Sequence, residues 1–244
     1  MSAVGGATLS AIVPELRRRA LAANLELAKS GLVTLTFGNV SVADRGSGLM
    51  AIKPSGVPYP DLREEAIPVL DIQRGAVIAG TARPSSDTPT HLVLYRAFSE
   101  IGGVVHTHSP FATAWAQARR AIPCFGTTHA DHFRGSVPVT RSLTPEEIGG
   151  NYEHETGALI VETLRELGLT PLAMPATLVA SHGPFVWGSD GQSAVANAIA
   201  LEMVAVAAYQ TMALCEDAAE ISAPLLARHF DRKHGTGAYY GQPS

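Results

Sequence analysis

The sequence has few of the features that mark secreted or disulfide-stabilised proteins. It contains two cysteines in 244 residues, Cys124 and Cys215, and neither belongs to a C-x-x-C pair. Two cysteines so far apart build neither a disulfide framework nor a cysteine-rich zinc site, so we expect both to be thiols in a reducing compartment. The N-terminal residues also lack the basic start and continuous apolar run of a signal peptide. These observations favour a cytoplasmic protein.

Charge and hydrophobicity exclude further classes of partner. The formal net charge is −4 and no basic stripe is present, so we do not expect nucleic acid to bind. The longest apolar stretch, residues 194–208, is interrupted by Asn197 and Glu202. It is too short to span a membrane and indicates a buried helix. No G-x-G-x-x-G or Walker sequence occurs, so a nucleotide cofactor is not expected.

The organisation of the chain favours one domain over residues 1–244. No linker, charge run or internal repeat divides it, and its 46% hydrophobic residues are ample for one core. Helices are expected at 12–29, 88–98, 110–118, 152–167, 190–214 and 224–233, with a helical turn after Thr144. Strands are expected at 33–36, 49–53, 69–72, 76–79, 103–107, 178–181 and 185–187. Because tight turns join several strand pairs, we predict a layered α/β domain with a mixed, largely antiparallel sheet.

Two histidines at the end of a predicted strand indicate a metal site. His106 and His108 follow the apolar pair Val104-Val105. Side chains two residues apart in a strand point to the same face, so both imidazoles can reach one divalent cation. His182, between the predicted strand 178–181 and Gly183, is the candidate third ligand. The alternatives are ordinary surface or turn histidines.

Asp87 is the carboxylate that could complete this ligand set or act on the substrate. It directly precedes Thr88-Pro89, the predicted start of a helix. An acidic residue at this position is also a typical helix cap, and that alternative remains open.

Three short polar loops have the composition of a phosphate site. Lys53-Pro54-Ser55-Gly56 offers a cation, a hydroxyl and a flexible amide, and Ser85-Ser86 lies near a predicted helix N-terminus. Gly38-Asn39 could add an amide and a side-chain donor. Each loop taken alone could equally be an ordinary turn.

Two segments contain candidate proton carriers. Asp131 is flanked by His129 and His132, an arrangement that suits general acid–base catalysis but also occurs in solvated loops. The C-terminal tail contains Tyr239 and Tyr240, and we expect such an aromatic tail to dock on its own chain or on a neighbouring subunit.

Together, these residues resemble the L-ribulose-5-phosphate 4-epimerases of the class II aldolase superfamily. The resemblance extends from about residue 13 to residue 242. It rests on ordered strings: LVTLTFGNVS at 32–41, KPSG at 53–56, PSSDTPTH at 84–91, VHTH at 105–108, GTTHAD at 126–131, SHGPF at 181–185, KHG at 233–235 and AYYGQ at 238–242. Residues 1–11 look like an unmatched N-terminal extension.

The resemblance implies a role for each candidate residue. The implied metal ligands are His106, His108 and His182, with Asp87 as a fourth, and the implied ion is Zn²⁺ or another divalent cation such as Mn²⁺ or Co²⁺. The implied substrate and phosphate residues are Gly38, Asn39, Lys53, Ser55, Gly56, Ser85 and Ser86, and His229 is a further active-site residue. Asp131 and Tyr240 match the pair that carries protons.

The resemblance also implies an architecture. The family fold is a three-layer α/β/α sandwich, and the family assembles as a homotetramer with active sites at subunit interfaces. Residues 235–244 would then form a tail that reaches a neighbouring subunit. Phe37 and His132 stand where many members have tryptophan and tyrosine.

The implied reaction interconverts L-ribulose 5-phosphate and D-xylulose 5-phosphate, in arabinose or ascorbate catabolism. C4 has no acidic hydrogen, so the C3–C4 bond is cleaved and re-formed after glycolaldehyde phosphate presents its other face. A class II sugar-phosphate aldolase is the nearest alternative, although related aldolases have glutamate where this chain has Asp87. A non-catalytic adducin-like binding domain is a remote alternative, since such a role does not need the three histidines.

Overall fold

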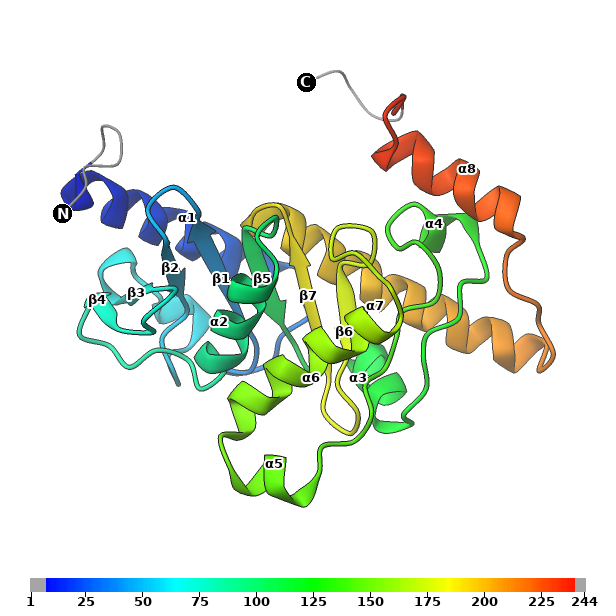
Figure 1. Cartoon of the computed structure of the whole chain (residues 1–244), viewed down its shortest axis with the longest axis horizontal. Helices are drawn as coiled ribbons and strands as arrows, with labels where there is room; N and C mark the ends of the chain where they lie inside the picture. Colours follow the sequence, from blue (N-terminus) through cyan, green and yellow to red (C-terminus); the bar gives the residue numbers. More distant parts are fainter. Residues whose placement is uncertain (1–7, 240–244) are drawn as a thin grey trace.

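One antiparallel sheet organises the chain, with strand order β4-β3-β2-β1-β5-β7-β6 (Figure 1). The computed structural model describes residues 8–239. The strands are β1 (Asn39–Asp44), β2 (Leu49–Ile52), β3 (Val69–Asp71), β4 (Val77–Ala79), β5 (Gly103–His106), β6 (Ala176–Leu178) and β7 (Pro184–Gly188). Every strand pair in the described residues is antiparallel, and one isolated parallel bridge joins Val139 to Leu178. The prediction of a largely antiparallel sheet is confirmed.

Helices cover both faces of the sheet. They are α1 (Leu9–Lys29), α2 (Thr88–Ala97), α3 (Pro110–Gln117), α4 (Thr127–Ala130), α5 (Pro145–Gly149), α6 (Tyr152–Glu166), α7 (Gly191–Leu214) and α8 (Ala223–His234). Single 3-10 turns occupy Tyr59–Asp61 and Glu64–Ala66. Helices α1 and α7 pack on one face, whereas α2 and α6 cover the other (Figure 1). This is the predicted three-layer α/β/α arrangement in a single domain.

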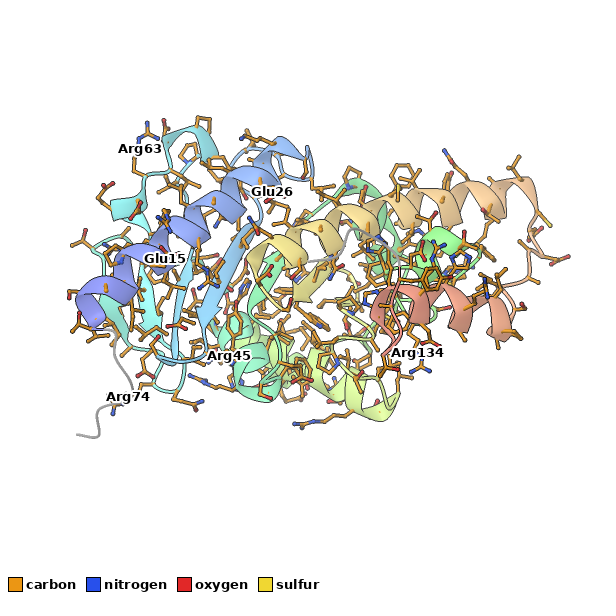
Figure 2. The ribbon with its side chains drawn as sticks, turned by 90° about the horizontal axis from the view of Figure 1, so that it is seen from above. Glu15, Glu26, Arg45, Arg63, Arg74 and Arg134 are labelled. Atoms are coloured by element: carbon orange, nitrogen blue, oxygen red, sulfur yellow. The ribbon has the colours of Figure 1, made fainter. Side chains whose placement is uncertain are left out.

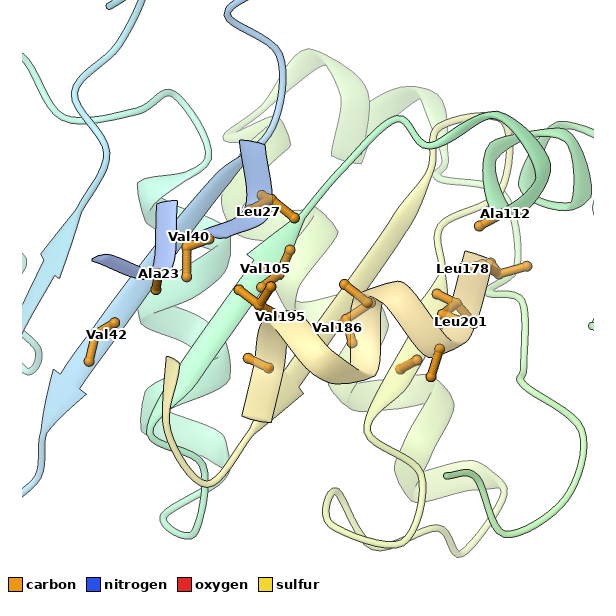
Figure 3. Close-up of a cluster of buried hydrophobic side chains, with 14 of the residues drawn as sticks. Ala23, Leu27, Val40, Val42, Val105, Ala112, Leu178, Val186, Val195 and Leu201 are labelled. Carbon is orange, nitrogen blue, oxygen red and sulfur yellow. The ribbon is translucent and has the colours of Figure 1, made fainter. Parts of the chain in front are cut away.

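Alternation along the central strands assigns each residue to one of two cores. Val105 and Val186 face α1 and α7, in the cluster of Figure 3. Their neighbours Val104 and Trp187 point to the opposite face and pack with α2 and α6. Because successive side chains in a strand point to opposite faces, His106 lies on the α2–α6 side with Val104.

Helix α7 owes its apolar character to the core. By length and composition it could cross a membrane, but half of its most apolar window is buried inside the protein. The two polar residues that interrupt the apolar stretch have defined partners. Asn197 donates to the Trp187 carbonyl, and the Glu202 carboxylate accepts the amides of Phe111 and Ala112 at the start of α3. Glu202 thereby fixes the helix that follows His108.

The predicted strand at residues 33–36 is wrong, and the strand forms at Asn39–Asp44 instead. Leu35 has φ of 56° and Gly38 has φ of 77°, so the backbone turns twice before the strand begins. The side chains of Leu35 and Phe37 are 75% and 52% exposed. β-Branched and aromatic composition was therefore misleading here, because no sheet neighbour buries these residues.

Close packing against α7 sets the position of β5. A Cβ atom on Gly103 would lie 2.3 Å from the carbonyl oxygen of Asp190, the residue that caps α7. Only glycine allows the strand to approach the helix N-terminus this closely. Since β5 ends at His106, this contact also positions the first candidate metal ligand.

The guanidinium of Arg45 holds the connection between α2 and β5 (Figure 2). Its nitrogens donate to the carbonyl oxygens of Tyr95, Phe98 and Ile101 at 2.6–2.8 Å. These carbonyls lie at or after the C-terminus of α2, where the helix itself offers no partners.

Replacing Arg45 should destabilise the fold. We expect Arg45→Met to lower the free energy of unfolding by about 2–4 kcal/mol, because several buried carbonyls lose a charged donor. Arg45→Lys should destabilise the protein almost as much, since an ammonium group cannot reproduce the planar fork of the guanidinium. Urea denaturation measures both, with exposed Arg74→Ala as a control expected to change stability by less than about 0.5 kcal/mol. A lysine variant as stable as the wild type would contradict this role.

Candidate active site

His106 and His108 face each other at the end of β5. Their Nε2 atoms lie 3.0 Å apart, and their ring centroids are 4.9 Å apart. The His106 ring stacks on Phe185 of β7, and its Nδ1 lies 2.9 Å from the carbonyl oxygen of Pro184. Since a carbonyl can only accept, Nδ1 carries the proton and the lone pair of Nε2 points toward His108.

His182 reaches the same point from the turn between β6 and β7. The predicted strand 178–181 is misplaced, since β6 spans Ala176–Leu178 and ends before the turn, in which Ser181 has φ of 62°. The His182 ring centroid lies 4.8 Å from that of His106 and 5.1 Å from that of His108. One ligand atom from each of the three histidines lies within 4.8 Å of the others. The structure thus brings His182 to His106 and His108, from which it is far apart in the sequence.

Burial favours the neutral form of His106 and His182. It lowers the pKa of His182 to about 4, with further lowering from His106 and His108. Burial likewise lowers the pKa of His106. Neutral imidazole is the form that binds a metal ion, so proton release costs little at neutral pH.

The side chain of Asp87 points into the same site. Asp87 occupies the N-cap position of α2, but its carboxylate Oδ2 accepts a 2.6 Å hydrogen bond from the Asn39 amide. Asn39 also donates to Ser85 Oγ at 3.1 Å. Burial alone would raise the pKa of Asp87, but nearby His106 and His91 together with Asn39 outweigh it and lower the pKa. Asp87 is therefore an anion beside the three histidines.

This donor set fits a divalent metal ion. Three imidazole nitrogens with one carboxylate suit Zn²⁺, and Mn²⁺, Co²⁺ or iron can use the same ligands. The partner that Pro184 provides for the distal nitrogen of His106 is typical of metal-binding histidines. His106, His108, His182 and Asp87 are the residues that could hold the ion.

A cavity of about 450 Å³ surrounds the histidines. This size accommodates a small phosphorylated sugar. Its lining includes predicted metal and substrate residues from loops that are distant in the sequence: Gly38, Asn39, Lys53, Ser55, Gly56, Ser85, Ser86, Asp87, His106, His108 and His182. Thr36, Phe37, Pro54, Tyr152 and Glu153 complete it.

Lys53 supplies the cavity with a cation. The residue is 2% exposed, its Nζ donates to the Thr36 carbonyl oxygen at 3.3 Å, and it lies 4.8 Å from the Tyr59 ring centroid. Burial lowers its pKa. Within residues 8–239 no carboxylate forms an ion pair with Lys53. A buried cation without an internal counter-ion favours an anionic ligand.

Asp131 and His229 lie elsewhere, where α4 packs against α8 (Figure 1). Asp131 accepts two hydrogen bonds from Arg232, at 2.9 and 2.6 Å, and its Oδ1 lies 3.2 Å from Nδ1 of His229. Burial would raise the pKa of Asp131, but Arg232 and His229 lower it. Neither Asp131 nor His229 lines the histidine cavity of the same chain. Tyr240, the other predicted proton carrier, lies outside the described residues.

Sequence reasoning missed three residues at these sites. Tyr152 and Glu153 line the cavity, and the Tyr152 hydroxyl lies 3.3 Å from Nδ1 of His182. They begin an amphipathic helix, and nothing in that local pattern distinguishes them from ordinary first-turn residues. Arg232 gave no signal either, because a basic residue in the last turn of a helix is common.

Most of the chain matches the profile of a known protein family. The profile of the family described as "Class II Aldolase and Adducin N-terminal domain" matches residues 18–221. The match spans most of the chain and includes the cavity and its three histidines.

Solved structures share the fold. An L-fuculose 1-phosphate aldolase is 23% identical, with 89% of this chain and 95% of that chain covered and a TM-score of 0.70. YgbL from Klebsiella pneumoniae, described as a candidate aldolase, epimerase or decarboxylase, is 24% identical, with 91% and 99% covered and a TM-score of 0.70. The L-fuculose 1-phosphate aldolase from Glaciozyma antarctica PI12 is 20% identical, with 98% and 90% covered and the same TM-score. At these identities the likeness establishes the fold.

Removing one imidazole should abolish tight metal binding. We expect His182→Gln to weaken zinc affinity by more than about 100-fold, since losing a direct ligand costs more than losing an outer-shell partner. Competition with a chromophoric chelator measures the dissociation constant. His154→Gln is the matched control, because His154 is 45% exposed in its side chain and does not line the cavity. Equal zinc affinity in the wild type and both variants would contradict the site.

Proposed function

Since the chain belongs to the class II aldolase and adducin N-terminal domain family, we propose that it cleaves and re-forms a carbon–carbon bond in a sugar phosphate. The leading candidate reaction is the interconversion of L-ribulose 5-phosphate and D-xylulose 5-phosphate. One observation carries the proposal: three histidines and a carboxylate share one cavity with small polar loops and a buried lysine that has no ion pair within residues 8–239.

Two groups of residues in the cavity lining suit the two ends of such a substrate. Lys53, with the Ser55 and Ser85-Ser86 hydroxyls, offers a charged donor and neutral donors for a phosphate. The histidines and Asp87 hold a divalent cation, which supplies Lewis-acid stabilisation of the negative charge that develops when the carbon–carbon bond breaks. Burial of the site strengthens these electrostatic interactions.

Epimerisation requires the aldehyde fragment to turn without leaving. A phosphate held by Lys53 keeps glycolaldehyde phosphate in the cavity while its carbonyl presents the opposite face. Each face then needs its own proton carrier. Asp131 and Tyr240 are the residues that the family resemblance assigns to this role.

We propose that a second copy of the chain completes the site, in a homotetramer. Asp131 and His229 lie apart from the cavity of their own chain, so they can serve catalysis only at a cavity on a neighbour. Helix α7 offers an apolar surface for such contact, with Ile199, Met203 and Tyr209 41%, 51% and 59% exposed.

Aldol cleavage with release of the fragments is the second candidate. The family includes aldolases by name, and several structures with this fold are named L-fuculose 1-phosphate aldolase. Both reactions share the bond-breaking step and differ in whether the aldehyde escapes. The shorter acid at Asp87 favours the epimerase.

Product analysis distinguishes the two reactions. We expect purified protein with Zn²⁺ or Mn²⁺ to convert L-ribulose 5-phosphate to D-xylulose 5-phosphate, and chelator to abolish the conversion. Lys53→Met should raise KM by about 10-fold or more, because a charge-assisted hydrogen bond to phosphate contributes roughly 1.5–3 kcal/mol. Exposed Lys29→Met, at the end of α1, is the matched control and should leave KM unchanged.

Three results would count against this assignment. Accumulation of dihydroxyacetone and glycolaldehyde phosphate at the rate of substrate loss would identify an aldolase. Turnover that survives complete metal removal would contradict the metal-assisted reaction. A KM increase of equal size with unphosphorylated L-ribulose would show that Lys53 does not bind the phosphate.

A further inference from the structure

A buried polar seam joins α2 to β1 and ends at the metal site. Asp87, His91 and Tyr95 are spaced by four residues, so they lie on one face of α2. They meet Asn39 and Ser41, which lie two residues apart on one face of β1. Asn39 binds Asp87, and Ser41 binds both His91 and Tyr95.

His91 is the member of the seam without an assigned role. Its side chain is fully buried, and its ring packs edge-on against Phe185. Nδ1 lies 2.7 Å from the Ser41 hydroxyl. Nε2, on the other side of the ring, has no hydrogen-bond partner among residues 8–239, although Asp87 lies one helical turn before it.

The hydrogen bonds around Ser41 are compatible with either tautomer of His91. The Tyr95 hydroxyl donates to the Ser41 carbonyl oxygen at 3.0 Å. The Ser41 hydroxyl can then donate its proton either to the Tyr95 hydroxyl, 2.9 Å away, or to Nδ1 of His91, 2.7 Å away. Burial keeps His91 neutral, lowering its pKa to about 3, and a neutral imidazole has one N–H. When Nδ1 accepts, that proton is on Nε2.

Electrostatics favours the tautomer with the proton on Nε2. Asp87 is the charged group that most favours protonation of His91, so its carboxylate attracts positive charge on the ring. An Nε2–H dipole is stabilised by this anion, whereas the lone pair of the opposite tautomer would be repelled by it. The opposite tautomer would also leave a buried acceptor near an anion without a donor.

We propose that His91 is a positioning residue of the metal site, whose Nε2–H attracts the Asp87 carboxylate and restrains it beside the three metal-binding histidines. Asn39 holds one oxygen of the same carboxylate from β1. The proposal rests on the metal site of the proposed function, and its test measures metal affinity rather than turnover.

Two amide substitutions separate the nitrogens of the ring. His91→Asn retains a polar group near Ser41 but lacks a donor at the Nε2 position. His91→Gln places an amide N–H near the Nε2 position, and Ser41 can then donate to the Tyr95 hydroxyl. We expect His91→Asn to weaken zinc binding by about 10-fold or more, in the range seen for outer-shell partners, and His91→Gln to stay within about threefold of the wild type.

A double-mutant cycle tests whether His91 acts through Asp87. In an Asp87→Asn background, His91→Asn should have no further effect on zinc affinity, because the carboxylate that it restrains is gone. A merely structural role would weaken binding equally in both backgrounds. Thermal denaturation of each variant identifies losses of affinity that follow from unfolding.

A test on the wild-type protein does not depend on the folding of any variant. Long-range ¹H–¹⁵N correlation spectra report the tautomer of each histidine, and we expect His91 to carry its proton on Nε2. A proton on Nδ1, or equal zinc affinity of His91→Asn and wild type, would overturn the role of His91 alone. Failure of the wild type to bind zinc would overturn the metal site and the proposed function together.

Discussion

The register between β1, β5 and β7 is the constraint on which the site depends. It places His106 opposite Asn39 on one side and opposite Phe185 on the other. A slip of one residue would turn His106 to the α1–α7 face, away from Asp87 and His182. Gly103 enforces this register, because the close contact with the capping residue of α7 admits no side chain. Backbone pairing thus decides which side chains meet in the cavity.

The site concentrates polar groups where burial is costly. His106, His91 and Lys53 are almost fully buried, and each loses hydration on folding. For the histidines, neutrality and hydrogen bonds with the Pro184 carbonyl and the Ser41 hydroxyl limit this cost. Lys53 has a carbonyl and an aromatic ring in place of a counter-ion. Such an arrangement is typical of a binding site, where a ligand supplies the missing interactions.

Sequence patterns predicted most of the fold and the cavity, for identifiable reasons. Helices α5 and α7 begin with capping boxes at Thr144 and Asp190, and the His-x-His spacing follows directly from strand geometry. The strand at Asn39–Asp44 was missed because two positive φ angles precede it, and propensity alone cannot reveal them. Tyr152, Glu153 and Arg232 were missed because their roles arise from contacts between distant elements. The separation of Asp131 from the cavity was likewise invisible in a list of motifs.

The central claim is that three imidazoles, brought together by two strand ends, bind one cation. X-ray absorption spectroscopy of the zinc-loaded protein tests it directly, since it reports the type, number and distance of the ligands. The account predicts three imidazole nitrogens at about 2.0–2.1 Å with oxygen completing the shell. Fewer than three imidazoles, or sulfur in the shell, would contradict it.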